Sequence, residues 1–117
     1  MLKIKRVYEL AGPGDGLRVL VDRLWPRGLS RDKAQIGLWM KEIAPSDALR
    51  KWFGHDPVRW EGFRKRYRLE LEGKKEMARM LAQKAAAGNV TLLFGAKDAE
   101  RNQAVVLNEF IAKMMKK

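Results

Sequence analysis

Cationic side chains follow three segments of this chain that have the character of strands. Arg23 and Arg27 come after one apolar run, and Lys41 and Lys97 come after two others. Arginine presents a planar fork of hydrogen-bond donors that suits phosphate or carboxylate, whereas lysine supplies a point charge. These residue types predict a pocket for an anionic small molecule of the phosphate or nucleotide type.

Two further residues belong to the predicted anion pocket. Trp25 lies between the two arginines, and Asp98 precedes the last helix, whose N-terminus would add backbone donors and a positive dipole end. The residues predicted to line the pocket are Arg23, Trp25, Arg27, Lys41, Lys97 and Asp98.

A purely structural interpretation of the two arginines stays open. Arg23 could pair with Asp22 or Glu42, and Arg27 could cap the end of a helix. Cations gathered at one place repel each other unless carboxylates or a bound anion offset them. Placement at the end of a strand favours the functional interpretation.

Asp22 and His55 are the candidate residues for acid–base chemistry. His55 is the single histidine, and histidine carries protons near neutral pH. It lies in a corner between two predicted helices, where a hydrogen bond to a carbonyl is the favoured explanation. One histidine and no cysteine argue against zinc, and magnesium bound by Asp22 and Asp98 has little support. The sequence therefore assigns no catalytic residue, no metal and no cofactor.

Residues 59–68 mix basic and aromatic side chains. Such a mixture can bind single-stranded nucleic acid through stacking and phosphate contacts. Trp60, Phe63 and Tyr67 are spaced three and four residues apart, which is typical of one face of a helix packed on a core. The spacing favours core aromatics with cations on the solvated face, whereas Trp25 and Trp39, near strand ends, are better candidates for function.

Strands and helices alternate along the chain. Apolar runs predict strands over residues 3–8, 17–22 and 90–94, with 38–40 as a further short one. Caps and helical spacing predict helices between them, one of which begins after Ser46. Crossover connections imply an α/β fold: a single domain, 1–117, with a small, mainly parallel sheet covered by helices.

This topology gathers the candidate residues. Ligands of parallel sheets bind beyond the carboxyl ends of the strands. That rule places residues 22–27, 41–46 and 95–98 on one rim, which is why the predicted pocket draws on all three segments.

Composition limits the classes of protein that need consideration. The chain has 117 residues, 46% of them hydrophobic, and no cysteine. No signal peptide and no membrane span are recognisable, so we expect a soluble cytoplasmic protein with no membrane partner. The net charge of +11 predicts at most weak, sequence-independent and salt-sensitive binding to nucleic acid.

Several motifs resemble a known family. They are the run from Val19 to Ser30, which contains DRLWPRG, the runs from Trp39 to Ser46, Leu49 to Pro57, Tyr67 to Leu71 and Val90 to Asp98, and Asn102. Together they resemble the short, YeaO-like branch of domain of unknown function 488. The resemblance covers nearly the whole chain and implies a compact α/β fold without an established activity.

Longer relatives in that family carry a cysteine-histidine-arginine motif after the last strand. Residues 97–102 of this chain read KDAERN instead. Without any cysteine, chemistry that depends on one does not transfer to this chain.

Three functions remain open from the sequence. The first is an anion-binding domain, or an enzyme of undetermined reaction, with its site at the strand ends. The second is a non-specific nucleic-acid-binding module that uses the wider basic surface. The third is a protein-interaction domain without catalysis. The oligomeric state does not follow from the sequence.

Overall fold

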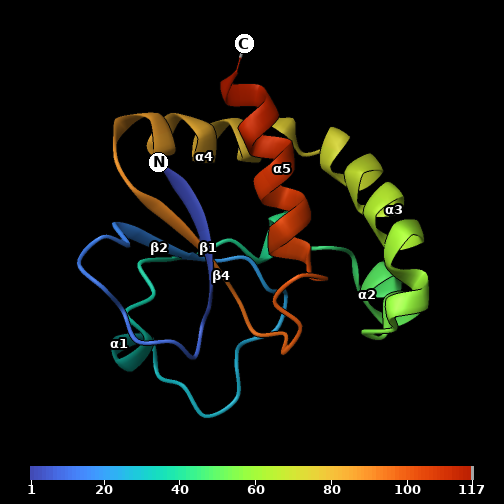
Figure 1. Cartoon of the computed structure of the whole chain (residues 1–117), viewed down its shortest axis with the longest axis horizontal. Coiled ribbons are helices and arrows are strands. Elements are labelled where there is room, and N and C mark those ends of the chain that lie inside the picture. Colours follow the sequence, from blue (N-terminus) through green and yellow to red (C-terminus); the bar gives the residue numbers. More distant parts are fainter. Residues whose placement is uncertain (117) are drawn as a thin grey trace.

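A computed structural model describes residues 1–116, and within them the chain forms a four-stranded sheet (Figure 1). The strands are β1 (Leu2–Arg6), β2 (Leu17–Leu20), β3 (Leu38–Trp39) and β4 (Val90–Phe94), in the order β1-β4-β2-β3. All three pairings are parallel. The predicted α/β class with a parallel sheet is therefore confirmed.

The helices lie in the crossovers and after the last strand. They are α1 (Arg31–Ala34), α2 (Asp47–Phe53), α3 (Trp60–Glu72), α4 (Lys75–Ala87) and α5 (Gln103–Met115), with short 3-10 turns over Lys41–Ile43 and Pro57–Arg59. Side-chain caps begin several of them. Ser30 Oγ accepts from the backbone N–H of Lys33, and Asn102 Oδ1 accepts from that of Val105, both at 3.1 Å.

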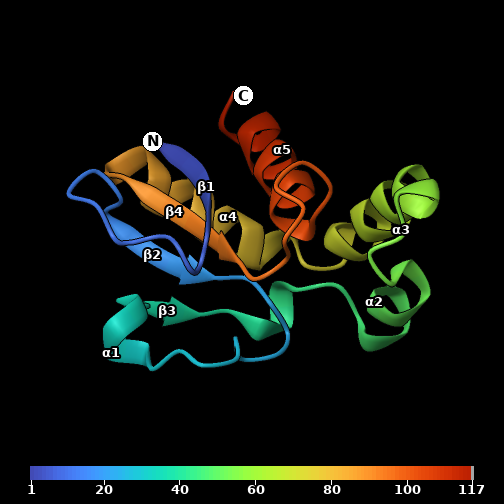
Figure 2. The same cartoon turned by 60° about the horizontal axis from the view of Figure 1, so that its bottom comes forward.

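Apolar side chains of the sheet alternate between two cores. Leu92 and Phe94 belong to the larger core, on the face that α4 and α5 cover (Figure 2). Leu20 and Leu93 belong to the smaller core on the opposite face, with Ala34 of α1. Because β4 lies between two strands and between two cores, all five of its residues are buried.

Three of the observed strands, β1, β2 and β3, are shorter than predicted, whereas β4 has the predicted bounds. β1 ends at Arg6, where the chain turns and Glu9 accepts a hydrogen bond from the Arg6 backbone N–H. β2 ends at Leu20, although the Val21 N–H still donates to the Leu93 carbonyl at 3.1 Å.

Within the described residues, no helix combines the length and the apolar character needed to cross a membrane.

Helices α2 and α3 pack against each other through aromatic rings. The rings of Phe53 and Phe63 stack with their centroids 4.4 Å apart. Tyr67 is fully buried, and its hydroxyl donates to the Ile43 carbonyl at 2.8 Å. This packing holds the C-terminal end of α2 beside the carboxyl ends of the strands.

Candidate functional site

A cleft of about 530 Å³ opens beyond the carboxyl ends of β2 and β4. Its walls come from the loop after β2, the end of α2, the turn after β4 and the start of α5. We call it the rim cleft. Its lining residues are Tyr8, Asp22, Arg23, Leu24, Trp25, Pro26, Arg27, Pro45, Arg50, Lys51, Phe53, Gly54, His55, Phe63, Gly95, Ala96, Asn102 and Gln103.

Positive charge dominates the rim cleft. Four of its lining residues are arginine or lysine, namely Arg23, Arg27, Arg50 and Lys51, and one, Asp22, is acidic. Arg27 and Lys51 are exposed, and neither forms an ion pair with another described residue. Arg50 has a long contact of 3.5 Å to Asp47. Three of the four cations therefore have donors available for a ligand.

Arg23 has a different environment from the other three cations. Its Nε donates to the Pro45 carbonyl at 2.9 Å, and its Nη2 donates to the Ala44 carbonyl at 3.1 Å. These bonds tie the loop after β2 to the segment that precedes α2. Arg23 binds neither Asp22 nor Glu42, the partners that the structural interpretation offered, and instead positions a wall of the cleft.

Asp22 is held from two distant parts of the chain. Its Oδ2 accepts from the Gly95 backbone N–H at 2.9 Å, and its Oδ1 accepts from the Gln103 side-chain amide. A Cβ at Gly95 would lie 2.8 Å from Oδ2, so the absence of a side chain there allows the contact. Burial raises the pKa of Asp22 from 3.8 to about 6, although both hydrogen bonds favour the ionised form.

The tryptophans shape the loop after β2. Trp25 and Trp39 meet edge to face with their ring centroids 5.2 Å apart. The Trp25 Nε1 donates to the Leu29 carbonyl at 2.7 Å, and the Trp39 Nε1 donates to the Asp22 carbonyl at 2.8 Å. Both indole donors are therefore engaged, and Trp25 offers the cleft a ring surface rather than a hydrogen bond.

His55 lies at the open side of the rim cleft. It is exposed, and it has a positive φ of 57° directly after Gly54, which ends α2. Its ring centroid is 6.1 Å from that of Phe53. No described residue is hydrogen-bonded to its imidazole, so the structure provides no orienting partner of the kind that a catalytic histidine has.

Three of the predicted pocket residues are not among those that line the cleft. Lys41 is exposed, with its ammonium 5.3 Å from the ring centroid of Trp39. Lys97 is exposed in the turn after β4. Asp98 accepts from the backbone N–H groups of Glu100 and Arg101 at 2.9 and 3.0 Å, and the first of these bonds is the main cause of its lowered pKa.

Sequence reasoning did not select Arg50, Lys51 or Gln103. A signal existed for the first two, because they occupy the last turn of a helix that a glycine ends beside His55. Gln103 begins α5, and nothing in its local sequence indicates contact with Asp22, which lies 81 residues earlier. Among residues 1–116, no three His, Cys, Asp or Glu side chains gather as a metal site would require.

The aromatic residues of 59–68 contribute to packing. Phe63 and Tyr67 are buried in the larger core. Of the neighbouring cations, Arg64 pairs with Glu109 at 3.0 Å, and Arg66 lies 3.8 Å from the ring centroid of Trp52. This segment therefore offers no row of exposed rings for stacking on bases.

Ser46 joins α2 to α3 next to the cleft. Its Oγ accepts from the Leu49 N–H at 3.2 Å and donates to Glu70 Oε2 at 2.6 Å, and its own N–H donates to Glu70 Oε1 at 2.8 Å. We expect Ser46→Ala to lower the free energy of unfolding by about 1–2 kcal/mol, measured by urea denaturation. Ser30→Ala, a matched cap on a four-residue helix, should cost only about 0.5 kcal/mol. Equal losses would contradict the role of Glu70.

Comparison with known proteins gives relatives over almost the full length of the chain. YeaO of Escherichia coli K12, an uncharacterized protein, is 41% identical over 110 residues, which cover 94% of this chain and 96% of YeaO. The uncharacterized protein Rv3073c of Mycobacterium tuberculosis is 38% identical over 110 residues, which cover 94% of this chain and 92% of Rv3073c. No solved structure matches the chain.

A family model described as "Inactive DUF488-N3 subclade" matches residues 1–117. This match confirms the resemblance to domain of unknown function 488 that the DRLWPRG run and the other sequence motifs indicate. The chain therefore belongs to the inactive DUF488-N3 subclade.

Proposed function

We propose that this protein binds a small anion of the phosphate or nucleotide type in the rim cleft and catalyses no reaction there. The observation that carries the proposal is the imbalance of charge: Arg23, Arg27, Arg50 and Lys51 line a cleft in which Asp22 is the one acidic lining residue. A concave site of this kind raises the local concentration of anions. Its position beyond the carboxyl ends of parallel strands is where α/β sheets bind ligands.

The lining residues divide into two groups under this proposal. Arg27, Arg50 and Lys51 contact the anion through charge-assisted hydrogen bonds. Arg23 positions the wall of the cleft formed by the segment before α2. Trp25 and Phe53 supply apolar surface for the rest of the ligand. The N-terminus of α5, a helix of 13 residues capped by Asn102, adds a positive dipole end at the same cleft.

The absence of catalysis is proposed on two grounds. The family description carries the word "inactive". In addition, no described residue of the cleft forms a nucleophile–base pair: the chain has no cysteine, and His55 has no orienting carboxylate. Asp22 accordingly acts on the charge of the site rather than as a proton donor in a reaction.

The nucleic-acid alternative has less support. The aromatic rings of 59–68 are packed, and Arg64 and Arg68 both pair with Glu109. What remains is the general attraction of a basic protein for polyanions, which is weak and falls steeply with salt. We therefore favour the binding of a small anion over the binding of nucleic acid. The reducing cytoplasm is the location we propose for this activity, because it suits a chain without cysteine.

Titration calorimetry with inorganic phosphate and with adenosine monophosphate tests the proposed function. We expect Arg27→Ala and Lys51→Ala each to weaken binding about tenfold to a hundredfold, because each removes a charge-assisted contact. Both side chains are exposed, so the melting temperatures should stay within about 2 °C of the wild type.

Matched controls come from the cations outside the cleft. Lys41→Ala and Lys97→Ala remove the same charge as Lys51→Ala, and neither residue lines the cleft. They should change the affinity by less than about twofold. A loss as large as that of Lys51→Ala would mean that net charge, and not the rim cleft, attracts the anion.

A further inference from the structure

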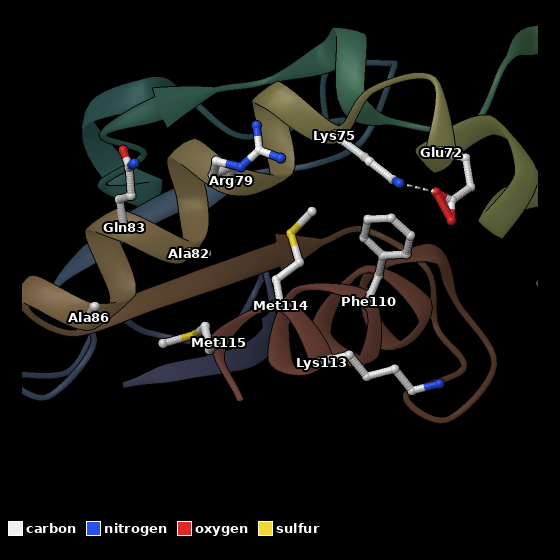
Figure 3. Close-up of a pocket in the computed structure, with 10 residues that line it drawn as sticks. All are labelled: Glu72, Lys75, Arg79, Ala82, Gln83, Ala86, Phe110, Lys113, Met114 and Met115. Atoms are coloured by element: carbon white, nitrogen blue, oxygen red, sulfur yellow. Dashed lines mark ion pairs between the residues drawn. The ribbon is translucent and has the colours of Figure 1, made fainter. Parts of the chain in front are cut away.

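A second hollow lies between α4 and α5 and shares no lining residue with the rim cleft. Its volume is about 620 Å³. Figure 3 shows its floor, to which α4 contributes Ala82 and Ala86 and α5 contributes Phe110 and Met114. We call it the α4–α5 groove. Small alanines allow close approach of another backbone, and methionine adapts its shape to a partner.

Basic side chains border this apolar floor. Lys75 and Arg79 lie on the α4 side and Lys113 on the α5 side. The one acidic lining residue, Glu72, is already neutralised by Lys75 at 3.0 Å. The ammonium of Lys113 and the guanidinium of Arg79 form no ion pair with a described residue. The unpaired charge around the groove is therefore positive.

The apolar surface continues from α5 toward α3. An adjoining hollow of about 460 Å³ shares Glu72, Phe110 and Lys113 with the groove and adds Leu69, whose side chain is 75% exposed. Lys65 and Arg68 border this part together with Glu109, which is already paired with Arg64 and Arg68. Exposed apolar surface inside a basic border is typical of a docking surface rather than of a solvated face.

We infer that the α4–α5 groove docks an acidic amphipathic helix of a partner protein. The apolar face of such a helix covers the floor, and its flanking carboxylates meet Arg79 and Lys113, the two bordering cations that form no ion pair with a described residue. The α4 wall runs from Lys75 to Ala86 at spacings of four, three and four residues, which keeps it on one helical face. Its length of about 17 Å matches about three turns of the docked helix.

Charge complementarity excludes the nearest competing occupant. A second copy of this chain bound through the same face would set two basic borders against each other. An acidic helix gains attraction at the unpaired Arg79 and Lys113, and a concave surface between two helices fits its cylinder.

Fluorescence anisotropy with a synthetic peptide tests the inference. The probe is a labelled 15-residue helix with a leucine stripe flanked by glutamates, compared with a scrambled peptide of the same composition that lacks the stripe. We expect the striped peptide to bind at least tenfold more tightly than the scrambled one. Equal affinities for the two peptides, or binding by neither, would overturn the inference.

Protein variants separate charge from shape. Arg79→Glu and Lys113→Glu should each weaken the striped peptide about tenfold, whereas Lys33→Glu, the same charge change on exposed α1, should alter affinity less than twofold. Ala86→Arg adds a positive charge but fills the floor, so it should also weaken binding about tenfold. Unchanged affinity in Ala86→Arg would overturn the groove as the site.

A membrane surface is the remaining alternative, and the same variants address it. At physiological salt, the protein should not co-sediment with vesicles of phosphatidylcholine and phosphatidylserine through a contact that Arg79→Glu removes. If it does co-sediment in this way, and the striped peptide does not compete, the basic border binds an anionic bilayer and the inference of a docked helix is wrong.

Discussion

Asp22→Asn is expected to raise the free energy of unfolding at pH 8 by on the order of 3 kcal/mol and to leave it nearly unchanged at pH 3.5. The reason is that folding buries this carboxyl and raises its pKa from 3.8 to about 6. A carboxyl with a raised pKa binds its proton more tightly in the folded state. Its contribution to stability is therefore fully present below pH 3.8 and is lost as the pH rises through about 6.

Asparagine removes the buried charge and keeps an oxygen for the Gly95 N–H. Urea denaturation of wild type and variant at pH 3.5, 5, 6.5 and 8 measures the difference between the two curves. Asp98→Asn is the control with the opposite sign, because hydrogen bonds from Glu100 and Arg101 lower the pKa of Asp98. Relative to the wild type at the same pH, Asp98→Asn should therefore not become more stable as the pH rises. A destabilised Asp22→Asn at pH 8 would contradict the burial argument.

The same substitution should act on ligand binding. Sulfate keeps its charge across this range, so its affinity reports the protein alone. Binding should tighten in the wild type as the pH falls through about 6, when Asp22 loses its charge, and this dependence should vanish in Asp22→Asn. His55→Asn removes the histidine that lines the cleft, and asparagine tolerates the positive φ at that position. A pH dependence that disappears in His55→Asn instead would assign the effect to the imidazole.

Arg23→Ala is expected to lower the free energy of unfolding by about 2–4 kcal/mol. The change removes two charge-assisted hydrogen bonds, to the carbonyls of Ala44 and Pro45. Lys74 also donates to the Ala44 carbonyl, at 3.1 Å, so the Pro45 carbonyl is the one left without its donor. Arg23→Lys keeps the charge but loses the two-pronged geometry, and its loss should be intermediate.

Arg27→Ala provides the matched comparison. Arg27 is exposed and its guanidinium has no described partner, so its removal should change stability by less than about 0.5 kcal/mol. Urea denaturation of the three variants, with and without phosphate, measures both effects. If Arg23→Ala unfolds like the wild type and only loses phosphate binding, Arg23 contacts the ligand and does not support the wall.

Much of the architecture follows from local sequence. The strand 90–94 and the helix 47–53 have the bounds that their residues predict, because an unbroken apolar run between turns, a Ser46 cap and a Gly54 stop act over a few residues. Strand ends in parallel sheets share one rim, and Arg23, Trp25 and Arg27, which follow β2, line the rim cleft there.

The topological rule positions backbones and leaves side chains undetermined. Lys41 and Lys97 follow strands as predicted, yet neither lines the rim cleft. The ammonium of Lys41 lies near the Trp39 ring, a contact that no spacing rule requires. The prediction that these lysines bind the anion remains to be tested by their alanine variants.

The remaining features depend on contacts between distant parts of the chain. Arg50 and Lys51 reach the cleft because Ser46 binds Glu70, 24 residues later, and because Arg23 holds the segment before α2. The pKa of Asp22 depends on burial, which raises it, and on hydrogen bonds from Gly95 and Gln103, 73 and 81 residues away, which lower it. The sequence alone determined the main helices and strands, their order along the chain and the rim of the sheet where cationic side chains gather. Only tertiary packing decided which cations enter the cleft and how its carboxyl titrates, because both depend on burial and long-range hydrogen bonds.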